Sequence, residues 1–101
     1  MIKHIVFWRL KDSALGKSKI DNSLELKSVL EDLQNKIGTI KKIEVGININ
    51  NSKAAYDVAL YSEFDSREDL ETYQKHPEHV KVFGFVNEIR EDRAVVDYEI
   101  R

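Results

Sequence analysis

The chain has 101 residues, the size of one small domain, and we expect a single domain over residues 1–101. Its 16 basic and 18 acidic side chains give a formal net charge of −2, which argues against a nucleic-acid binder, because such proteins concentrate positive charge. The absence of cysteine excludes disulfides, thiolate metal sites and a cysteine nucleophile. No apolar run is long enough to span a bilayer and no small-residue cleavage site follows the N-terminus, so we expect a cytoplasmic protein without membrane contact.

The first predicted element is a strand over residues 2–10, rich in β-branched and aromatic side chains. Alternation places His4, Val6 and Trp8 on one face of this strand and Ile5 on the other. Both faces are largely apolar, so the strand is expected to be covered on both sides.

A helix is predicted over residues 18–37, followed by two strands over residues 43–49 and 56–64. The helix repeats apolar side chains with the spacing of a core-facing stripe. This stripe consists of Leu26, Val29, Leu30, Leu33 and Ile37. In the second of the two strands, Leu60 lies on the apolar face that also carries Phe64.

The second half of the chain predicts two consecutive helices and a last strand. Ser66 and Asp69 form a capping-box pattern that begins a helix ending near His76, and Pro77 suits the first turn of the next helix. The core-facing stripe of that next helix is His79, Val82, Phe83, Val86 and Ile89. Residues 94–100 alternate again and predict the last strand.

This order of elements is typical of an α+β, ferredoxin-like split βαβ protomer, with helices on one face of a four-stranded antiparallel sheet. The opposite face carries Ile5, Phe7, Ala59 and Tyr61, and the chain has no further element to cover them. We therefore predict a homodimer through the helix-free sheet face. The alternative is that these are scattered surface side chains, which need no partner.

Three segments resemble the stress-responsive A/B-barrel family, also called Dabb. They are residues 1–6, the Tyr-x-x-His-Pro-x-His-Val segment at residues 73–80, and residues 95–98. The resemblance covers the whole chain in order and implies a dimeric α/β barrel built from two ferredoxin-like protomers. Members of the family include stress-induced proteins and proteins without an assigned activity.

The family also includes polyketide cyclases, and the chain is distantly similar to olivetolic acid cyclase. That similarity implies catalytic roles for Tyr73 and His79 in aldol chemistry, with His4 beside the pocket. Val58 and Trp8 stand where the cyclase has a pocket histidine and a smaller aliphatic residue, which implies a different substrate.

Strand parity and the helical stripe place the candidate site between the sheet and the helices. The predicted catalytic residues are Tyr73 and His79, and the predicted ligand contacts are His4, Val6, Trp8, Leu60 and Phe83. A histidine base and a tyrosine hydroxyl suit proton abstraction beside a carbonyl, so we expect a small apolar or carbonyl-containing ligand. The alternative is a buried, hydrogen-bonded brace that binds nothing.

The His76-Pro77-Glu78-His79 segment also invites a metal interpretation. Pro77 places His76 at or before the start of the helix, so the two imidazoles need not converge, and no thiol is available. No serine-nucleophile motif and no glycine-rich phosphate loop occurs. We expect no metal and no cofactor.

Two functions remain open from the sequence. The first is a non-catalytic dimeric protein that binds a small ligand, and the second is a cofactor-free lyase or polyketide-cyclase-like enzyme. A pocket filled by Trp8, Phe83 and Phe64 favours the first function, whereas an open, partly polar cavity at Tyr73, His79 and His4 favours the second.

Overall fold

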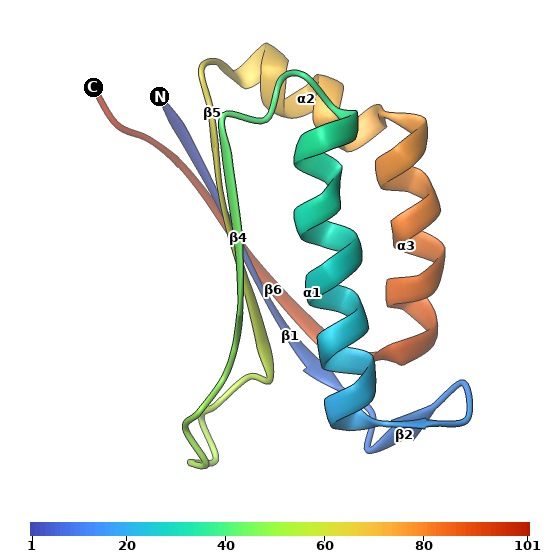
Figure 1. Ribbon diagram of the computed structural model, residues 1–101. Helices are drawn as coiled ribbons and strands as arrows, with labels where there is room; N and C mark the ends of the chain where they lie inside the picture. The colour runs from blue at the N-terminus through green and yellow to red at the C-terminus, as the bar shows by residue number, and fades with distance from the viewer.

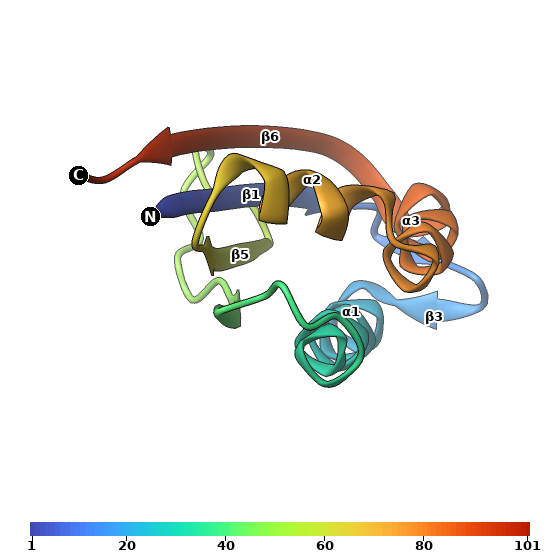
Figure 2. The same ribbon diagram turned by 90° about the horizontal axis from the view of Figure 1, so that it is seen from above.

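A four-stranded antiparallel sheet carries all three helices on one of its faces, as the computed structural model of residues 1–101 shows (Figure 1). The elements in chain order are β1 Ile2–Leu10, β2 Ser13–Ala14, β3 Lys17–Ser18, α1 Lys19–Lys36, β4 Lys42–Ile47, β5 Val58–Phe64, α2 Arg67–Lys75, α3 Pro77–Ile89 and β6 Arg90–Glu99. The predicted ferredoxin-like fold is confirmed. Viewed from above, α1 and α3 stand on the same side of the sheet, and α2 connects the end of β5 to the start of α3 (Figure 2).

The strand order β4-β5-β1-β6 places the first and last strands side by side in the sheet. Their antiparallel register sets His4 opposite Asp97 and Trp8 opposite Arg93. The ends of the chain are also joined, because the backbone N–H of Ile100 donates to the carbonyl of Met1 at 2.8 Å. Residues from the two ends of the sequence therefore meet on the helix-covered face.

The core lies between the sheet and the helices. The predicted stripe of α1 is buried there, with Leu26 and Leu33 at most 1% exposed. Burial of a leucine side chain contributes about 1.5–3 kcal/mol, so this stripe holds α1 against the sheet. The off-stripe residues Ile20 and Leu24 are 54% and 52% exposed, and they face away from the core.

Each helix begins at a side chain that accepts a hydrogen bond from the first turn. Ser66 Oγ accepts from the backbone N–H of Asp69 at 3.1 Å, which confirms the predicted start of α2. At the start of α3, His76 Nδ1 accepts from the backbone N–H of Glu78 at 3.1 Å, and Pro77 occupies the first turn. Such caps satisfy N–H groups that have no partner within the helix.

Several boundaries differ from the sequence prediction. The hairpin β2–β3 was not predicted, because two-residue strands leave no alternation to detect. β6 begins at Arg90, not at residue 94, because the chain passes from α3 into the sheet without a loop, and Arg90 already pairs with Leu10. β4 ends at Ile47, two residues earlier than predicted, and Ile49 beyond it is 97% exposed.

The helix-free face of the sheet is bare in the protomer (Figure 1). Phe7 is 39% exposed there and Val96 is 56% exposed. The registers set Phe7 beside both Ala59 and Ala94, and Ile5 beside Val96, so these apolar side chains form one continuous patch. No helix in the chain is both long enough and apolar enough to cross a membrane.

Candidate functional site

A small enclosed space lies between strands β1 and β5 and helix α3, and we call it the inner hollow. Its volume is about 30 Å³. The residues that line it are His4, Val6, Trp8, Leu30, Leu60, Tyr73, His79, Val82, Phe83, Val86, Arg90 and Arg93. All seven residues that the sequence predicted for a site are among them, so the structure brings the whole predicted set together.

His4 enters the inner hollow from β1 and is only 3% exposed. Its Nδ1 donates to the carboxylate of Asp97, the residue opposite it on β6. Because a carboxylate only accepts, this contact fixes the proton on Nδ1 and leaves Nε2 free. The backbone of His4 is also held, since its carbonyl accepts from Ser62 Oγ at 3.0 Å.

His79 enters from the first turn of α3, and its ring centroid lies 4.5 Å from that of Tyr73. His79 Nδ1 lies 3.2 Å from the backbone carbonyl oxygen of Gln74, so Nδ1–H donates and Nε2 carries the free lone pair. Burial lowers the pKa of His79, against the raising effect of the Gln74 carbonyl, and the nearby His4 and Arg93 side chains lower it further. The imidazole is therefore held in its neutral form, which is the form that accepts a proton.

Two hydrogen-bond donors in the inner hollow have no acceptor. Tyr73 is fully buried, yet its hydroxyl has no partner, and the indole Nε1–H of Trp8 has none either. Burial raises the pKa of Tyr73, with Arg93 opposing the shift, so the hydroxyl stays protonated. An unpaired buried polar group costs about 1–3 kcal/mol, so two such donors on residues that line one space require an explanation.

A larger and more open space adjoins the inner hollow, and we call it the outer groove. It has a volume of about 330 Å³ and is lined by Gln74, His79, Val80, Phe83, Gly84 and Arg93. His79, Phe83 and Arg93 line both spaces. Phe83 is 45% exposed, so the boundary between the two spaces is reached from solvent.

The brace interpretation explains part of this geometry. Both His4 and His79 are hydrogen-bonded, as residues of a structural brace would be. It does not explain the Tyr73 hydroxyl or the Trp8 indole, because a brace pairs its polar atoms.

Sequence analysis missed Asp97, Arg90 and Arg93. Asp97 and Arg93 reach the site through the register of β6 against β1, which no local pattern reveals. The segment that contains Arg90 and Arg93 carries four charged residues in succession, so it lacks the apolar alternation that would predict a strand. Adjacency of the first and last strands, which the fold class implies, is the one signal that pointed to this segment.

The histidines of the His-Pro-Glu-His segment do not converge. His76 Nδ1 caps α3 at the backbone of Glu78, whereas His79 turns to the carbonyl of Gln74. No group of three or more histidine, aspartate or glutamate side chains in the chain is arranged to hold a metal ion.

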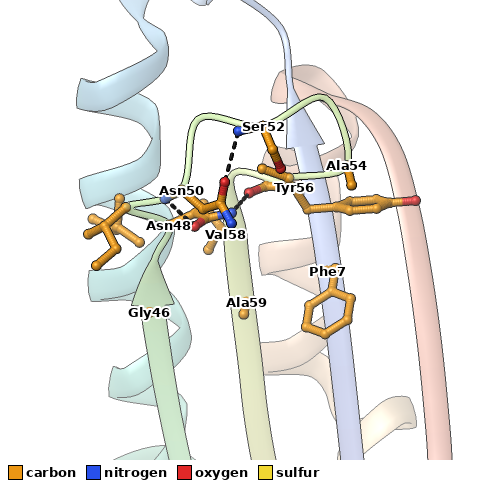
Figure 3. A pocket seen from close by; sticks show the side chains of 12 residues that line it. Phe7, Gly46, Asn48, Asn50, Ser52, Ala54, Tyr56, Val58 and Ala59 are labelled. Atoms are coloured by element: carbon orange, nitrogen blue, oxygen red, sulfur yellow. Dashed lines mark hydrogen bonds between the residues drawn. The ribbon is translucent and has the colours of Figure 1, made fainter.

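A third space of about 500 Å³, which we call the loop hollow, lies on the helix-free face beneath the loop between β4 and β5 (Figure 3). Phe7 and Ala59 form its floor side by side, and Tyr56 lies 6.0 Å from Phe7 between ring centroids. No carboxylate, imidazole or basic side chain lines the loop hollow. It continues the apolar patch of the sheet and offers no acid–base chemistry.

The fold and the hollow beneath the helices define a class: ferredoxin-like α+β proteins with a small recess between sheet and helices. Comparison with known proteins then identifies the family. The Stress responsive A/B Barrel Domain matches residues 2–100, and this chain belongs to that family.

Individual relatives agree with this assignment. The stress-response A/B barrel domain-containing protein DABB1 of Arabidopsis thaliana is 29% identical over 102 residues, which cover 97% of this chain and 46% of that protein. The chain spans less than half the length of the curated relatives it matches.

Two solved structures illustrate the range of the fold. A dimeric protein of unknown function and ferredoxin-like fold from Bacteroides fragilis is 42% identical, with a TM-score of 0.85 over 98% of this chain and 95% of the other. Hydroxynitrile lyase from Passiflora edulis is 21% identical, with a TM-score of 0.82 over 99% and 93%. The second likeness shows a shared fold alone.

Proposed function

We propose that this chain is a homodimeric stress-responsive A/B barrel domain protein that binds a small carbonyl-containing ligand in the inner hollow. The observation that carries the proposal is the pair of unpartnered buried donors, the Tyr73 hydroxyl and the Trp8 indole N–H. Two unpaired donors on residues that line one largely apolar space match a ligand oxygen that accepts, such as a carbonyl.

The volume of the inner hollow limits which part of a ligand enters it. A space of about 30 Å³ holds one or two water-sized groups and no ring. The bulk of a ligand then lies in the outer groove, and only its carbonyl end reaches Tyr73. Because Trp8 and Phe83 line the inner hollow and little volume remains in it, a binding protein is favoured over an enzyme that acts on bulky polyketides.

The dimer is supported by the bare apolar patch around Phe7 and by the dimeric Bacteroides fragilis relative. Burial of this patch against a second copy removes its apolar side chains from water without exposing the inner hollow, which lies on the opposite face. The site and the dimer interface are therefore separate surfaces.

Trp8 provides the test, because it is the only tryptophan in the chain and its indole N–H gives one isolated NMR signal. Titration with methyl levulinate, a neutral ketone, should move this signal downfield as the indole begins to donate to the ketone oxygen. Tyr73→Phe should weaken the response. An indole signal that stays fixed with methyl levulinate and with levulinate at tens of millimolar contradicts the proposal.

A second candidate function, proton abstraction beside a carbonyl, is favoured by the state of His79. Its neutral imidazole has a free Nε2, and the Tyr73 ring lies next to it. Nε2 would take a proton from the carbon beside the ketone. The C–H electron pair then forms the C=C bond of an enolate, and the negative oxygen accepts from the Tyr73 hydroxyl.

Exchange of ligand protons for deuterium measures this step directly. In D2O the imidazolium exchanges its proton with solvent and returns deuterium to the carbon. The proton signal of the methyl group beside the ketone of methyl levulinate should therefore fade. His79→Gln should abolish the effect, and Lys81→Gln, on the exposed side of the same helix, should not. Equal exchange rates with and without protein would leave ligand binding as the function.

A further inference from the structure

The arginine pair at the edge of the inner hollow is the part of the site without an assigned role. Arg90 and Arg93 both line the inner hollow, and Arg93 also lines the outer groove. No aspartate or glutamate lines either space. The lining therefore carries positive charge with no acidic side chain to balance it.

Neither guanidinium is paired with a carboxylate. Arg93 makes no side-chain hydrogen bond and no ion pair, and the Nε of Arg90 donates only to the side-chain oxygen of Asn87, at 3.1 Å. Asp97, which follows Arg93 by four residues on β6, has its carboxylate engaged by His4. Of the other three arginines in the chain, Arg67 alone forms an ion pair, with Glu99 at 3.4 Å.

The sheet register brings Arg93 to the unpaired donors. Arg93 lies directly opposite Trp8, and side chains paired in this way project from the same face with Cβ atoms about 5 Å apart. Arg93 also lies near enough to influence the pKa of both Tyr73 and His79. One side of the site therefore presents an indole N–H, a phenol and a free guanidinium, all of which donate.

We propose that the ligand is an anion: a carbonyl compound that also bears a carboxylate, with the carboxylate bound by Arg93 in the outer groove and the carbonyl end in the inner hollow. This inference rests on the proposed function and adds the charge class of its ligand. Arginine binds carboxylates through two parallel N–H donors, which gives the site orientation as well as attraction. Arg90 adds positive charge to the same edge.

Levulinate and methyl levulinate test the charge alone, because they share one ketone and differ in the carboxylate. Both are titrated against the Trp8 indole signal in the unmodified chain and in Arg93→Gln. Levulinate should bind the unmodified chain about fivefold more tightly than its ester, the range of one partly exposed ion pair. Arg93→Gln should remove that preference, so that the variant binds levulinate and the ester equally, and a dispersed NMR spectrum shows that the variant folds.

Arg101→Gln is the matched control, since it removes the same charge at the far end of the chain and should keep the preference. If the ester binds as tightly as levulinate, or if Arg93→Gln binds levulinate as the unmodified chain does, the anion assignment is overturned while the binding site stands. If neither compound moves the indole signal, the proposed function fails, and this inference fails with it.

Discussion

Tyr73 is a fully buried residue whose aromatic ring is well packed and whose hydroxyl is unsatisfied. The ring lies 5.1 Å from that of Phe64 and 4.5 Å from that of His79. The ring therefore stabilises the core, whereas the hydroxyl costs free energy in the unliganded protein. Because Tyr73 lines the inner hollow and its hydroxyl has no partner in the protein, we expect this hydroxyl to hydrogen-bond to the proposed ligand.

Tyr73→Phe separates these two contributions. Because the hydroxyl has no partner, its removal should leave the free energy of unfolding unchanged or raise it by about 1 kcal/mol. Tyr61→Phe is the control, since the Tyr61 hydroxyl donates to Glu63 at 2.5 Å and accepts from Lys3 at 2.6 Å. Urea unfolding at equal protein concentration should show a loss for the control alone, and a loss of more than 1 kcal/mol in Tyr73→Phe would support the brace.

His79 makes stability depend on pH in one direction. Its pKa in the folded chain is below the ordinary value of 6.5, because burial disfavours its protonation and the nearby His4 and Arg93 side chains oppose it further. Above that ordinary value the imidazole is neutral in both states, and the full stability is present. As the pH falls through 6.5, the unfolded chain binds a proton that folded His79 does not, so the free energy of unfolding falls.

His79→Gln should therefore lose less stability than the unmodified chain between pH 7.5 and about pH 5.5. Urea unfolding at several pH values measures the difference. Titration of the His79 ring signals by NMR gives the folded pKa independently. A His79 pKa above 6.5 in that titration would reverse the expected slope and refute the prediction.

At the scale of elements, the hairpin β2–β3 turns through two residues with positive φ. Leu15 has φ of 54° and Gly16 has φ of 74°. This conformation suits Asn-Gly, whereas a leucine in it is strained. Leu15 is 57% exposed, so its side chain contributes little burial in return.

Leu15→Asn should raise the free energy of unfolding by about 0.5 kcal/mol, because asparagine tolerates the left-handed region. Gly16→Ala should lower it by about 1 kcal/mol through the backbone alone. No atom lies within 4 Å of the added Cβ, so steric contact does not confuse the second measurement. Thermal unfolding of the two variants should give shifts of opposite sign; shifts of one sign would show that the turn is not strained.

The elements that the sequence predicted are those in which apolar side chains repeat with the period of a strand or a helix. Alternation in β1 placed His4 and Trp8 on the helix side, and the stripe of α3 placed His79 and Phe83 toward them. Those local rules, with the family resemblance for Tyr73, were enough to assemble the seven predicted residues around one hollow.

The remaining features depend on relations between distant segments. Asp97 meets His4 only through the register of β6 on β1, and a shift of one residue would turn it to the other face. The size of the inner hollow depends on how Trp8, Phe83 and Leu60 pack, which alternation does not determine. The lack of an ion pair at Arg93 could not be predicted either, because it depends on where every acidic side chain lies in the folded chain.

At the scale of the whole molecule, the two faces of the sheet differ in what covers them and in the spaces they line. The helix-covered face holds the core and the inner hollow. The helix-free face holds the apolar patch and the loop hollow (Figure 3). Both edge strands, β4 and β6, have one unpaired side in the protomer. An open sheet with a bare apolar face is prone to association, and burial of that face in the proposed dimer would prevent it.

Phe7→Asp tests whether that partner is a second copy of the chain. Phe7 is 39% exposed in the protomer, so an aspartate there can reach water and the protomer should still fold. In a dimer that buries the patch, the same carboxylate would lose its hydration without a counter-charge, a cost of several kcal/mol for each copy. Sedimentation at micromolar concentration should give twice the chain mass for the unmodified protein and one chain mass for the variant.

Leu24→Asp is the matched control, because Leu24 is 52% exposed on the outer side of α1, and this variant should remain dimeric. An unmodified chain that sediments as a monomer, or a Phe7→Asp variant that stays dimeric, would place the contact elsewhere than on the helix-free face.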